Sequence, residues 1–381
     1  MLLREIIGQE DVKRQLRESV LSGHVAHAQM FCGASGVGKL QLAIAYAQYL
    51  ACEHRTATDS CGECPTCKQF AALEHPDLHF TFPIVKTDKG PDTCNDFMSE
   101  FRKMILQRGY FDADDWMEEL SGRERKQPLI YEKESSEIQR KLNLKAFGNG
   151  YKTMIIWQPE RMNIQCANKL LKLLEEPPER TLFLFVTAHP EELLPTIQSR
   201  LRPIAVPNLS EQEIANALIA RHQVDEQQAY DFAHMAHGSY RNAERMTEEN
   251  KQQEGYLQDF QALMRNAWLV GIRQNYDALK NLNDWCMDTA AKPREVQKGF
   301  LQYCQAQVRE NFIRNYNIPS INYQTHDEAQ FSTRFAPFIN ERNVQELTDV
   351  LSRAETQINQ NGNAKIVLFD LIMQVIVLIK K

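Results

Sequence analysis

A glycine-rich loop between an apolar stretch and a helix is the feature that most limits how this chain can fold. The loop runs from Gly33 to Leu40, after the apolar stretch 28–31 and before the alanine-rich stretch 41–47. Strand, loop and helix in this order form a P-loop, where backbone N–H groups and Lys39 bind phosphates. A loop that Lys39 stabilises without any nucleotide is the alternative. The pattern predicts an α/β domain with a parallel sheet, and its candidate nucleotide-binding residues are Gly33, Gly36, Gly38 and Lys39.

Two positions at which a working P-loop ATPase holds magnesium lack a suitable side chain. Position 40 is Leu, where a Ser or Thr hydroxyl is needed, and the apolar strand expected at 153–157 ends in Trp157 and Gln158 instead of an acid. Glu160 is the nearest carboxylate, but it lies two positions later and beyond a proline, so the sequence does not establish that it points where a strand-end acid would. The sequence thus predicts a degenerate site in which ATP binding is doubtful.

Four cysteines with the spacing of metal ligands follow the P-loop helix. Their pattern is C-x8-C-x2-C-x2-C, formed by Cys52, Cys61, Cys64 and Cys67. Four thiolates within sixteen residues can enclose one tetrahedral zinc ion with no open position, which is typical of a structural site. An iron–sulfur cluster, for which the C-x2-C-x2-C run also occurs, and unligated thiols are the alternatives.

Charge and hydropathy restrict the class of protein. The formal net charge is -6 over 381 residues, so the chain has no overall field that would attract a phosphate backbone. The first residues show neither a basic region nor a long apolar region, which predicts a cytoplasmic protein. The most apolar stretch, 366–379, is short for a membrane span and contains Asp370 and Gln374. We expect it to form a buried terminal helix and expect no membrane contact.

Prolines and a helix-start pattern indicate a boundary within the chain. Pro203 and Pro207 end the first unit, and Ser210 with Glu213 forms a capping box that begins a helical unit. Residues 83–137 are polar and acidic and are interrupted by glycine and proline, so we expect an enlarged loop or insertion in the first unit.

The motifs occur in an order that resembles one family. Residues 6–9 (Ile-Ile-Gly-Gln), the P-loop, the cysteines, the run 170–178 (Leu-Leu-Lys-Leu-Leu-Glu-Glu-Pro-Pro) and the Ser-Arg pair at 199–200 follow one another. This order is similar to that of bacterial clamp-loader subunits of the AAA+ class, over about residues 1–248. The Leu of the P-loop and the Trp-Gln pair at 157–158 resemble the delta-prime type, because the motor type (gamma/tau) keeps the Thr and the acid.

The resemblance implies a fold class of α/β plus all-α. Residues 1–206 would form an AAA+ nucleotide-site-like domain, with a zinc module at about 52–67 and the insertion at about 83–137. Residues 207–249 would form a small helical lid, and residues 250–381 a helical collar through which subunits assemble into a ring.

The same resemblance assigns roles to three polar residues. Thr187 ends the apolar stretch 181–187 and matches the sensor-1 position, while Arg241 matches the sensor-2 position. A solvated arginine is the alternative for Arg241. Arg200 matches an arginine finger that acts on a neighbouring subunit, although Leu201 departs from the family pattern Ser-Arg-Cys. A positive charge that only complements the end of a helix is the alternative for Arg200.

The implied function is that of a non-hydrolysing subunit of the replicative clamp loader, which helps to place the sliding clamp on primed DNA. Its own ATPase activity would be absent, and DNA-directed DNA polymerase activity would reside in another subunit of the holoenzyme. The expected partners are the motor (gamma/tau) and delta subunits, with the clamp and primed DNA reached through the complex. One alternative is an active AAA+ ATPase of motor or helicase type, which the changed P-loop opposes. The other is a zinc-dependent DNA-binding module, which the acidic neighbours Glu53, Asp59 and Glu63 oppose.

Overall fold

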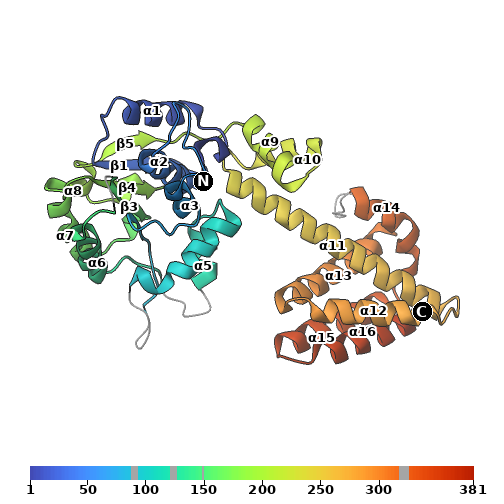
Figure 1. The fold of residues 1–381 in the computed structure, drawn as a ribbon. Coiled ribbons are helices and arrows are strands. Elements are labelled where there is room, and N and C mark those ends of the chain that lie inside the picture. Colours follow the sequence, from blue (N-terminus) through green and yellow to red (C-terminus); the bar gives the residue numbers. More distant parts are fainter. Residues whose placement is uncertain (87–92, 121–126, 148–149, 317–325) are drawn as a thin grey trace. The chain divides into compact units, whose positions relative to one another are not determined.

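Apolar stretches of the first half of the chain form a parallel β-sheet (Figure 1). The structure is a computed structural model, and it describes residues 1–86, 93–120, 127–147, 150–316 and 326–381. Within these residues the sheet has five strands in the order β2-β3-β4-β1-β5. The strands are β1 (Ala28–Cys32), β2 (Leu78–Thr81), β3 (Lys152–Trp157), β4 (Thr181–Thr187) and β5 (Arg202–Ala205). Parallel pairing places the carboxyl ends of all these strands at one edge of the sheet.

The described chain divides into two units, Met1–Thr247 and Glu248–Lys381, and the division falls inside a long helix, α11 (Tyr240–Gly271). The first unit also contains α1 (Glu10–Leu21), α2 (Lys39–Ala51), α3 (Pro65–Ala71), α4 (Met98–Lys103), α5 (Ala113–Leu120), α6 (Glu132–Asn143), α7 (Ile164–Glu175), α8 (Pro195–Gln198), α9 (Glu211–His222) and α10 (Glu226–Met235). Shorter turns are η1 (Leu3–Glu5), η2 (Cys94–Phe97), the π-helical η3 (Met104–Arg108), η4 (Pro159–Arg161) and η5 (Pro190–Glu192).

Both faces of the sheet are covered by helices, as a parallel sheet requires. Successive side chains of β4 alternate between the two faces. Leu182 and Leu184 pack in the cluster that includes α1 and α2, whereas Phe183 and Phe185 pack in the cluster that includes α6 and α7. Strand β4 is therefore buried along its whole length, and the P-loop between β1 and α2 stands at the carboxyl edge of the sheet.

Of the enlarged loop or insertion expected at 83–137, residues 87–92 and 121–126 lie outside the described residues, and the rest is not a polar loop. Its described part is largely helical and contributes apolar side chains to the core. Phe101 stacks on Phe82 with ring centroids 3.9 Å apart, and Trp116 packs against both rings. Asp114, Glu118 and Glu119 are exposed, whereas Asp115 and Glu134 are buried.

The helical segment after the sheet begins at the predicted capping box. The Glu213 N–H group donates to the Ser210 hydroxyl at 3.3 Å, and the Ser210 N–H group donates to the Glu213 carboxylate at 2.8 Å. Helices α9 and α10 and the start of α11 enclose a small cluster that also holds Ile7 and Tyr110. This cluster lies within the first unit.

The second unit is entirely helical in its described part. Besides the rest of α11 it contains α12 (Ala278–Ala291), α13 (Arg294–Arg314), α14 (His326–Phe335), η7 (Ala336–Phe338), α15 (Val344–Asn359) and α16 (Ala364–Leu378). Helix α16 is the terminal helix that the sequence predicts, and Leu368, Leu371 and Val375 are buried in the unit's core. Across the described residues, none of the helices combines the length and the apolar character that a membrane span needs.

Candidate functional site

The P-loop connects β1 to α2, as the sequence predicts. Gly36 and Gly38 adopt φ angles of +76° and +90°, in the left-handed region that favours glycine. The buried Lys39 ammonium donates hydrogen bonds to the carbonyl oxygens of Gly33, at 2.8 Å, and Ala34. Burial lowers the pKa of Lys39 to about 8. The lysine that would bind phosphates in an active site thus contacts the carbonyls of its own loop.

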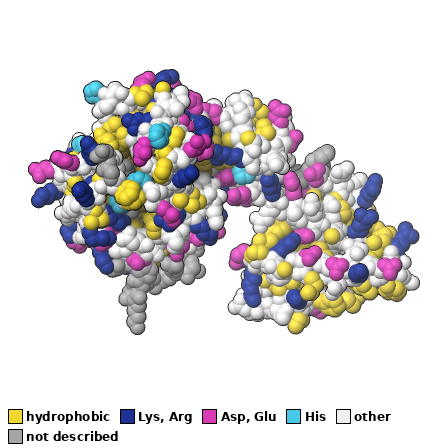
Figure 2. All heavy atoms as spheres, viewed as in Figure 1, with side chains coloured by type: hydrophobic (Ala, Val, Ile, Leu, Met, Phe, Trp, Pro, Cys, Tyr) yellow, Lys and Arg dark blue, Asp and Glu magenta, His cyan; other side chains and the backbone are white. Residues whose placement is uncertain are grey.

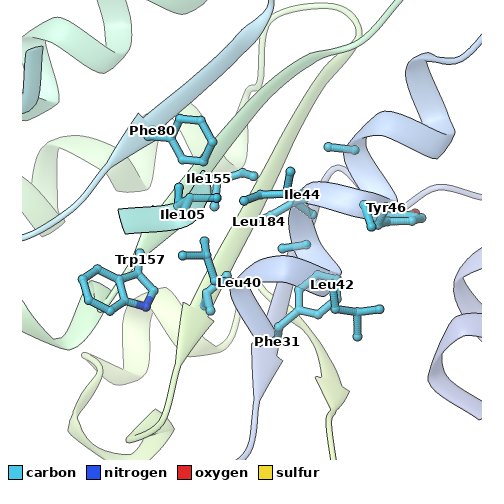
Figure 3. Close-up of a cluster of buried hydrophobic side chains, with 14 of the residues drawn as sticks. Phe31, Leu40, Leu42, Ile44, Tyr46, Phe80, Ile105, Ile155, Trp157 and Leu184 are labelled. Atoms are coloured by element: carbon cyan, nitrogen blue, oxygen red, sulfur yellow. The ribbon is translucent and has the colours of Figure 1, made fainter. Parts of the chain in front are cut away.

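The two positions that would supply magnesium ligands belong to one hydrophobic cluster. Leu40 lies in the first turn of α2 and Trp157 ends β3, and they are 4% and 6% exposed. Figure 3 shows both side chains among the other apolar residues of this cluster. The Trp157 ring also contacts Phe111 and Phe101, with centroids 5.2 Å and 5.7 Å away. Because Mg²⁺ needs oxygen ligands, these two positions cannot contribute to its binding.

Glu160, whose position the sequence left open, lines the cavity beside the P-loop. The turn η4 follows Gln158, whose φ of +54° reverses the chain, and returns Glu160 to the carboxyl end of the sheet. There its carboxylate accepts a hydrogen bond from the Thr187 hydroxyl at 2.8 Å. Burial raises the pKa of Glu160, and this hydrogen bond opposes the increase. Thr187, the expected sensor-1 residue, is therefore bound to a carboxylate of the same chain.

The open space beside the P-loop is small. It measures about 110 Å³ and is lined by Lys39, Leu40, Trp157, Glu160 and Tyr110, among other residues. Sites for small molecules usually measure about 300–1,000 Å³. The side chains of this protein therefore occupy much of the space that a bound nucleotide would require.

Tyr110 is one of two site residues that the sequence did not predict. A Cβ atom placed on Gly38 would lie 2.6 Å from Cε1 of Tyr110, so the ring packs directly on the glycine of the P-loop. The Tyr110 hydroxyl accepts a hydrogen bond from the N–H group of Ile7 at 3.0 Å. Nothing in the sequence around Tyr110, an aromatic residue in an acidic segment, indicates that it contacts the P-loop.

Asp115 is the second unpredicted residue, and it binds the predicted sensor-2 arginine. Arg241 is 2% exposed, so it is not the solvated side chain that was the alternative. Its Nε and Nη2 atoms each donate to one oxygen of Asp115 at 2.8 Å, and its Nη1 atom donates to Glu244 at 2.9 Å. The N–H group of Arg241 also lies 3.3 Å from the carbonyl oxygen of Gly36. Arg241 thus stands beside the P-loop with carboxylates of its own chain as partners.

Arg200, the expected arginine finger, lies at the end of α8 and is one-third exposed. Its Nε atom donates to Glu175 at 3.0 Å, and its Nη1 atom donates to the carbonyl oxygen of Thr196 at 2.8 Å. Arg200 is not among the residues that line the P-loop cavity. Its position at the surface is compatible with contact to another chain.

The four predicted cysteines come together, and their sulfur atoms fit a zinc ion. All four Sγ atoms lie within 4.8 Å of one another, with 3.6 Å between Cys52 and Cys61 and 3.8 Å between Cys61 and Cys67. A tetrahedral zinc ion with Zn–S bonds of about 2.3 Å separates its sulfur ligands by about 3.8 Å. The cluster can therefore hold zinc with four sulfur ligands.

Backbone N–H groups point at these sulfur atoms. Cys61 donates to Cys52 at 3.3 Å, and Cys64 and Cys67 donate to the preceding cysteine of the motif at 3.4 Å. The hydrogen bond from Cys64 is the largest cause that lowers the pKa of Cys61, to about 6, whereas burial raises the pKa values of Cys52 and Cys67. Four thiolates need a compensating cation, and a divalent metal supplies it.

Asp59, one of the acidic neighbours of the cysteines, is a buried structural residue. Its two oxygens accept hydrogen bonds from the N–H groups of Leu3, at 3.1 Å, and Arg4, at 3.0 Å. The cysteine loop is thereby joined to the N-terminal segment.

Comparisons with known proteins agree with this arrangement. A family model described as "DNA polymerase III, delta subunit" matches residues 8–210. DNA polymerase III subunit delta' of Pseudomonas aeruginosa is 30% identical over 182 residues, which cover 48% of this chain and 43% of the relative. The delta' subunit of Escherichia coli is 29% identical, covering 49% of this chain and 44% of the relative. DNA polymerase III subunit tau of Bacillus subtilis is 25% identical, and the match covers 63% of this chain and 36% of the relative. The chain thus spans less than half the length of these curated relatives.

Proposed function

This chain belongs to the DNA polymerase III delta-subunit family, and we propose that it is a delta-prime-type subunit of the replicative clamp loader that does not hydrolyse ATP. In this role it stands beside ATP-hydrolysing subunits and helps them to place the sliding clamp on primed DNA. Residues 1–206 serve as its AAA+ domain, 207–249 as its lid and 250–381 as its collar. The polymerase activity of the holoenzyme resides in another subunit.

The burial of Leu40 and Trp157 carries the proposal that hydrolysis is absent. Phosphoryl transfer in P-loop ATPases relies on Mg²⁺, which is held by a hydroxyl at the position of Leu40 and by an acid at the position of Trp157. Both positions here are filled by apolar side chains of the core. Glu160, the nearest acid, already accepts the hydrogen bond from Thr187.

Arg200 acts in trans on ATP that a neighbouring subunit holds. Its guanidinium would neutralise charge that develops on the γ-phosphate during transfer. In the chain alone Arg200 is bound to Glu175, but that carboxylate is half exposed. Such surface pairs contribute only about 0–1 kcal/mol, so a phosphate of the neighbour can replace Glu175 as the partner.

An apolar stripe on α16 supports assembly with the motor (gamma/tau) and delta subunits. Ile366, Phe369, Met373 and Val377 are spaced three or four residues apart on this helix and are 46–69% exposed. Figure 2 shows hydrophobic side chains gathered on the face of the second unit where α15 and α16 lie. Exposed patches of this kind typically mark protein–protein contacts.

The four-cysteine cluster serves as a structural zinc site. All four coordination positions are taken by thiolates, so no position remains for a substrate or water. The ion would brace the loop between α2 and α3 against the N-terminal segment that Asp59 binds.

An active ATPase of the motor type is the second candidate, because the tau subunit of Bacillus subtilis matches more of this chain than the delta' subunits do. The two candidates differ in a simple measurement. Magnesium-dependent ATP turnover by the chain alone, lost in Lys39→Ala, would establish the motor type.

The experiment that tests the trans mechanism is reconstitution with the motor and delta subunits. We expect Arg200→Ala to assemble normally but to lower ATP hydrolysis stimulated by clamp and DNA. An arginine finger contributes on the order of 10³ to 10⁵ in rate at the site it serves, whereas independent sites elsewhere in the ring would retain their turnover. Arg200→Lys should rescue poorly, because an ammonium lacks the planar fork.

Arg202→Ala is the matched control, because Arg202 is an exposed arginine two residues away. It should leave both assembly and turnover unchanged. If Arg200→Ala assembles and loads clamps at the rate of the unmodified loader, Arg200 is only a charge at a helix end and the trans mechanism is wrong.

A further inference from the structure

The segment from Gly109 to Asp115 contacts the nucleotide-binding elements of the first unit at several points. It comprises the turn between η3 and α5 and the first residues of α5, and it belongs to the insertion, for which neither the sequence nor the proposed function supplies a role. Its two ends and its tyrosine each engage a different part of the P-loop site. These contacts are all made within the first unit.

Tyr110 occupies the space beside the last glycine of the P-loop. Glycine at this position leaves room for a phosphate to approach the backbone at the start of the helix. Here the ring of Tyr110 fills that room, since a Cβ atom on Gly38 would lie 2.6 Å from it. The ring is 3% exposed and packs edge-on against Tyr240 with centroids 4.9 Å apart.

The polar atoms of the segment also find partners around the site. The N–H group of Ile7 donates to the Tyr110 hydroxyl at 3.0 Å, which fixes the ring from the N-terminal side. The Gln41 side chain, in the first turn of α2, donates to the carbonyl oxygen of Gly109. The segment is therefore anchored at its first two residues, Gly109 and Tyr110.

Asp115 binds Arg241 as a phosphate group would. A guanidinium recognises carboxylate and phosphate with the same pair of parallel hydrogen bonds. Arg241 uses its Nε and Nη2 atoms for such a pair, and Asp115 also accepts from Arg108 at 2.7 Å. Burial alone would raise the pKa of Asp115, but the hydrogen bonds from Arg241 and the Asp112 backbone, together with the positive charges of Arg241 and Arg108, outweigh burial and lower it to about 2. At neutral pH Asp115 is therefore an anion bound to the arginine whose backbone lies beside the P-loop.

We propose that residues 109–115 are a built-in occupant of the P-loop site, with Tyr110 in the place of bound nucleotide and Asp115 as the anion for Arg241, so that the folded chain is closed to ATP. This goes beyond the proposed function, which requires only that hydrolysis is absent. The small cavity of about 110 Å³ is the space that remains once the segment is in place.

Calorimetric titration with ATP tests the inference on the full chain. The unmodified chain should show no saturable binding up to about 1 mM ATP. Tyr110→Ala should bind ATP with a Kd at least about tenfold lower than that concentration. Adding Lys39→Ala to Tyr110→Ala should abolish the gained binding, because the ATP would be bound at the P-loop, to which Lys39 belongs. Asp114→Asn is the matched control, since Asp114 is an exposed residue of the same segment, and it should behave as the unmodified chain does.

Three results would overturn the inference. The unmodified chain binds ATP as tightly as Tyr110→Ala does, or Tyr110→Ala folds and gains no binding, or the gained binding survives Lys39→Ala. If Tyr110→Ala does not fold, hydrogen exchange of the unmodified chain decides. We then expect slow exchange at the Ile7 amide and no effect of ATP on the P-loop amides. Protection of those amides by ATP, or fast exchange at Ile7, would contradict the proposal.

These outcomes are independent of the reconstitution with Arg200→Ala. A chain that binds no ATP but whose loader is insensitive to Arg200→Ala would contradict the proposed trans mechanism and leave this inference intact. If instead the chain binds ATP at its P-loop and the loader depends on Arg200, this inference is contradicted and the trans mechanism is left intact.

Discussion

Replacing Asp115 by Ala should destabilise the first unit far more than a surface substitution would. Asp115 and Arg241 have side chains that are only 3% and 2% exposed, and two hydrogen bonds of 2.8 Å join them. Asp115 also accepts a backbone hydrogen bond from Asp112 at 2.9 Å. Removing the carboxylate leaves the buried guanidinium without its bidentate partner.

The size of the effect follows from what remains around Arg241. Removing one partner of a buried ion pair costs about 3–5 kcal/mol, because the other charge stays buried. Glu244 still accepts one hydrogen bond from Arg241 at 2.9 Å, which compensates part of that charge. We therefore expect the free energy of unfolding to fall by about 3 kcal/mol, at the lower end of the range. Asp114→Asn, an exposed change on the same helix, should stay within about 0.5 kcal/mol.

A double-mutant cycle with Arg241→Met separates the ion pair from other effects. Because the double variant contains neither charge of the pair, it should lose less stability than the two single variants together, with a coupling energy of about 2 kcal/mol. Hydrogen exchange measured by mass spectrometry in increasing urea follows the amides of each unit separately, and those of the second unit serve as an internal reference. Additive losses, within about 0.5 kcal/mol, would show that the pair contributes no specific stabilisation and would refute the reasoning.

Three further predictions concern the metal site, the P-loop and the collar. Chain purified under reducing conditions should contain about one zinc ion, and Cys64→Ser should lower both the metal content and the melting temperature; iron in the metal analysis would contradict this. Leu40→Thr should lower the free energy of unfolding by about 2–3 kcal/mol, measured in urea, and should restore no ATP turnover, because Trp157 still fills the strand end; turnover gained by this change alone would show that the core does not prevent catalysis. Met373→Glu should abolish co-elution with the motor subunits because it places a charge in the apolar stripe, whereas the exposed Asn359→Glu should co-elute normally; equal behaviour of the two variants would remove the stripe from the interface.

The parts of the site that the sequence predicted are those set by short-range patterns. The P-loop needs only a strand, a few glycines and a helix, so Lys39 and Leu40 can be placed from their neighbours alone. The four cysteines lie within sixteen residues, and their spacing is enough to bring the sulfur atoms together. In both cases the contacts that matter join residues close in the chain.

Contacts across long sequence separations could not be predicted in this way. Ile7 and Tyr110 are 103 residues apart, and Asp115 and Arg241 are 126 residues apart. Nothing in a local window connects these residues, since their meeting depends on how the helices pack on the sheet. Glu160 is a different case, because the turn that returns it to the sheet depends on the left-handed backbone of the residue before the proline.

The helical character of the segment 83–137 was available in the sequence but was obscured by composition. Phe97, Phe101, Met104 and Ile105 follow the spacing i, i+4, i+7, i+8, which is the apolar stripe of a helix. The charged residues between them, Glu100, Arg102 and Lys103, made the segment resemble a solvated loop. Periodicity is the better guide here, because a helix at the surface of a core is expected to be polar on one side.

Lys39 and Arg241 have structural contacts in this chain that do not involve a nucleotide. Lys39 ties the carbonyls of Gly33 and Ala34 together, and Arg241 joins the start of α11 to Asp115. A ligand can shift a conformational equilibrium only if it contacts the two states differently. On the inference above, the occupant of the P-loop site is part of the chain, so its contacts persist whatever nucleotide the neighbouring subunits hold. The first unit would then keep one conformation through the ATP cycle, and Arg200 would present its guanidinium from a surface of constant geometry.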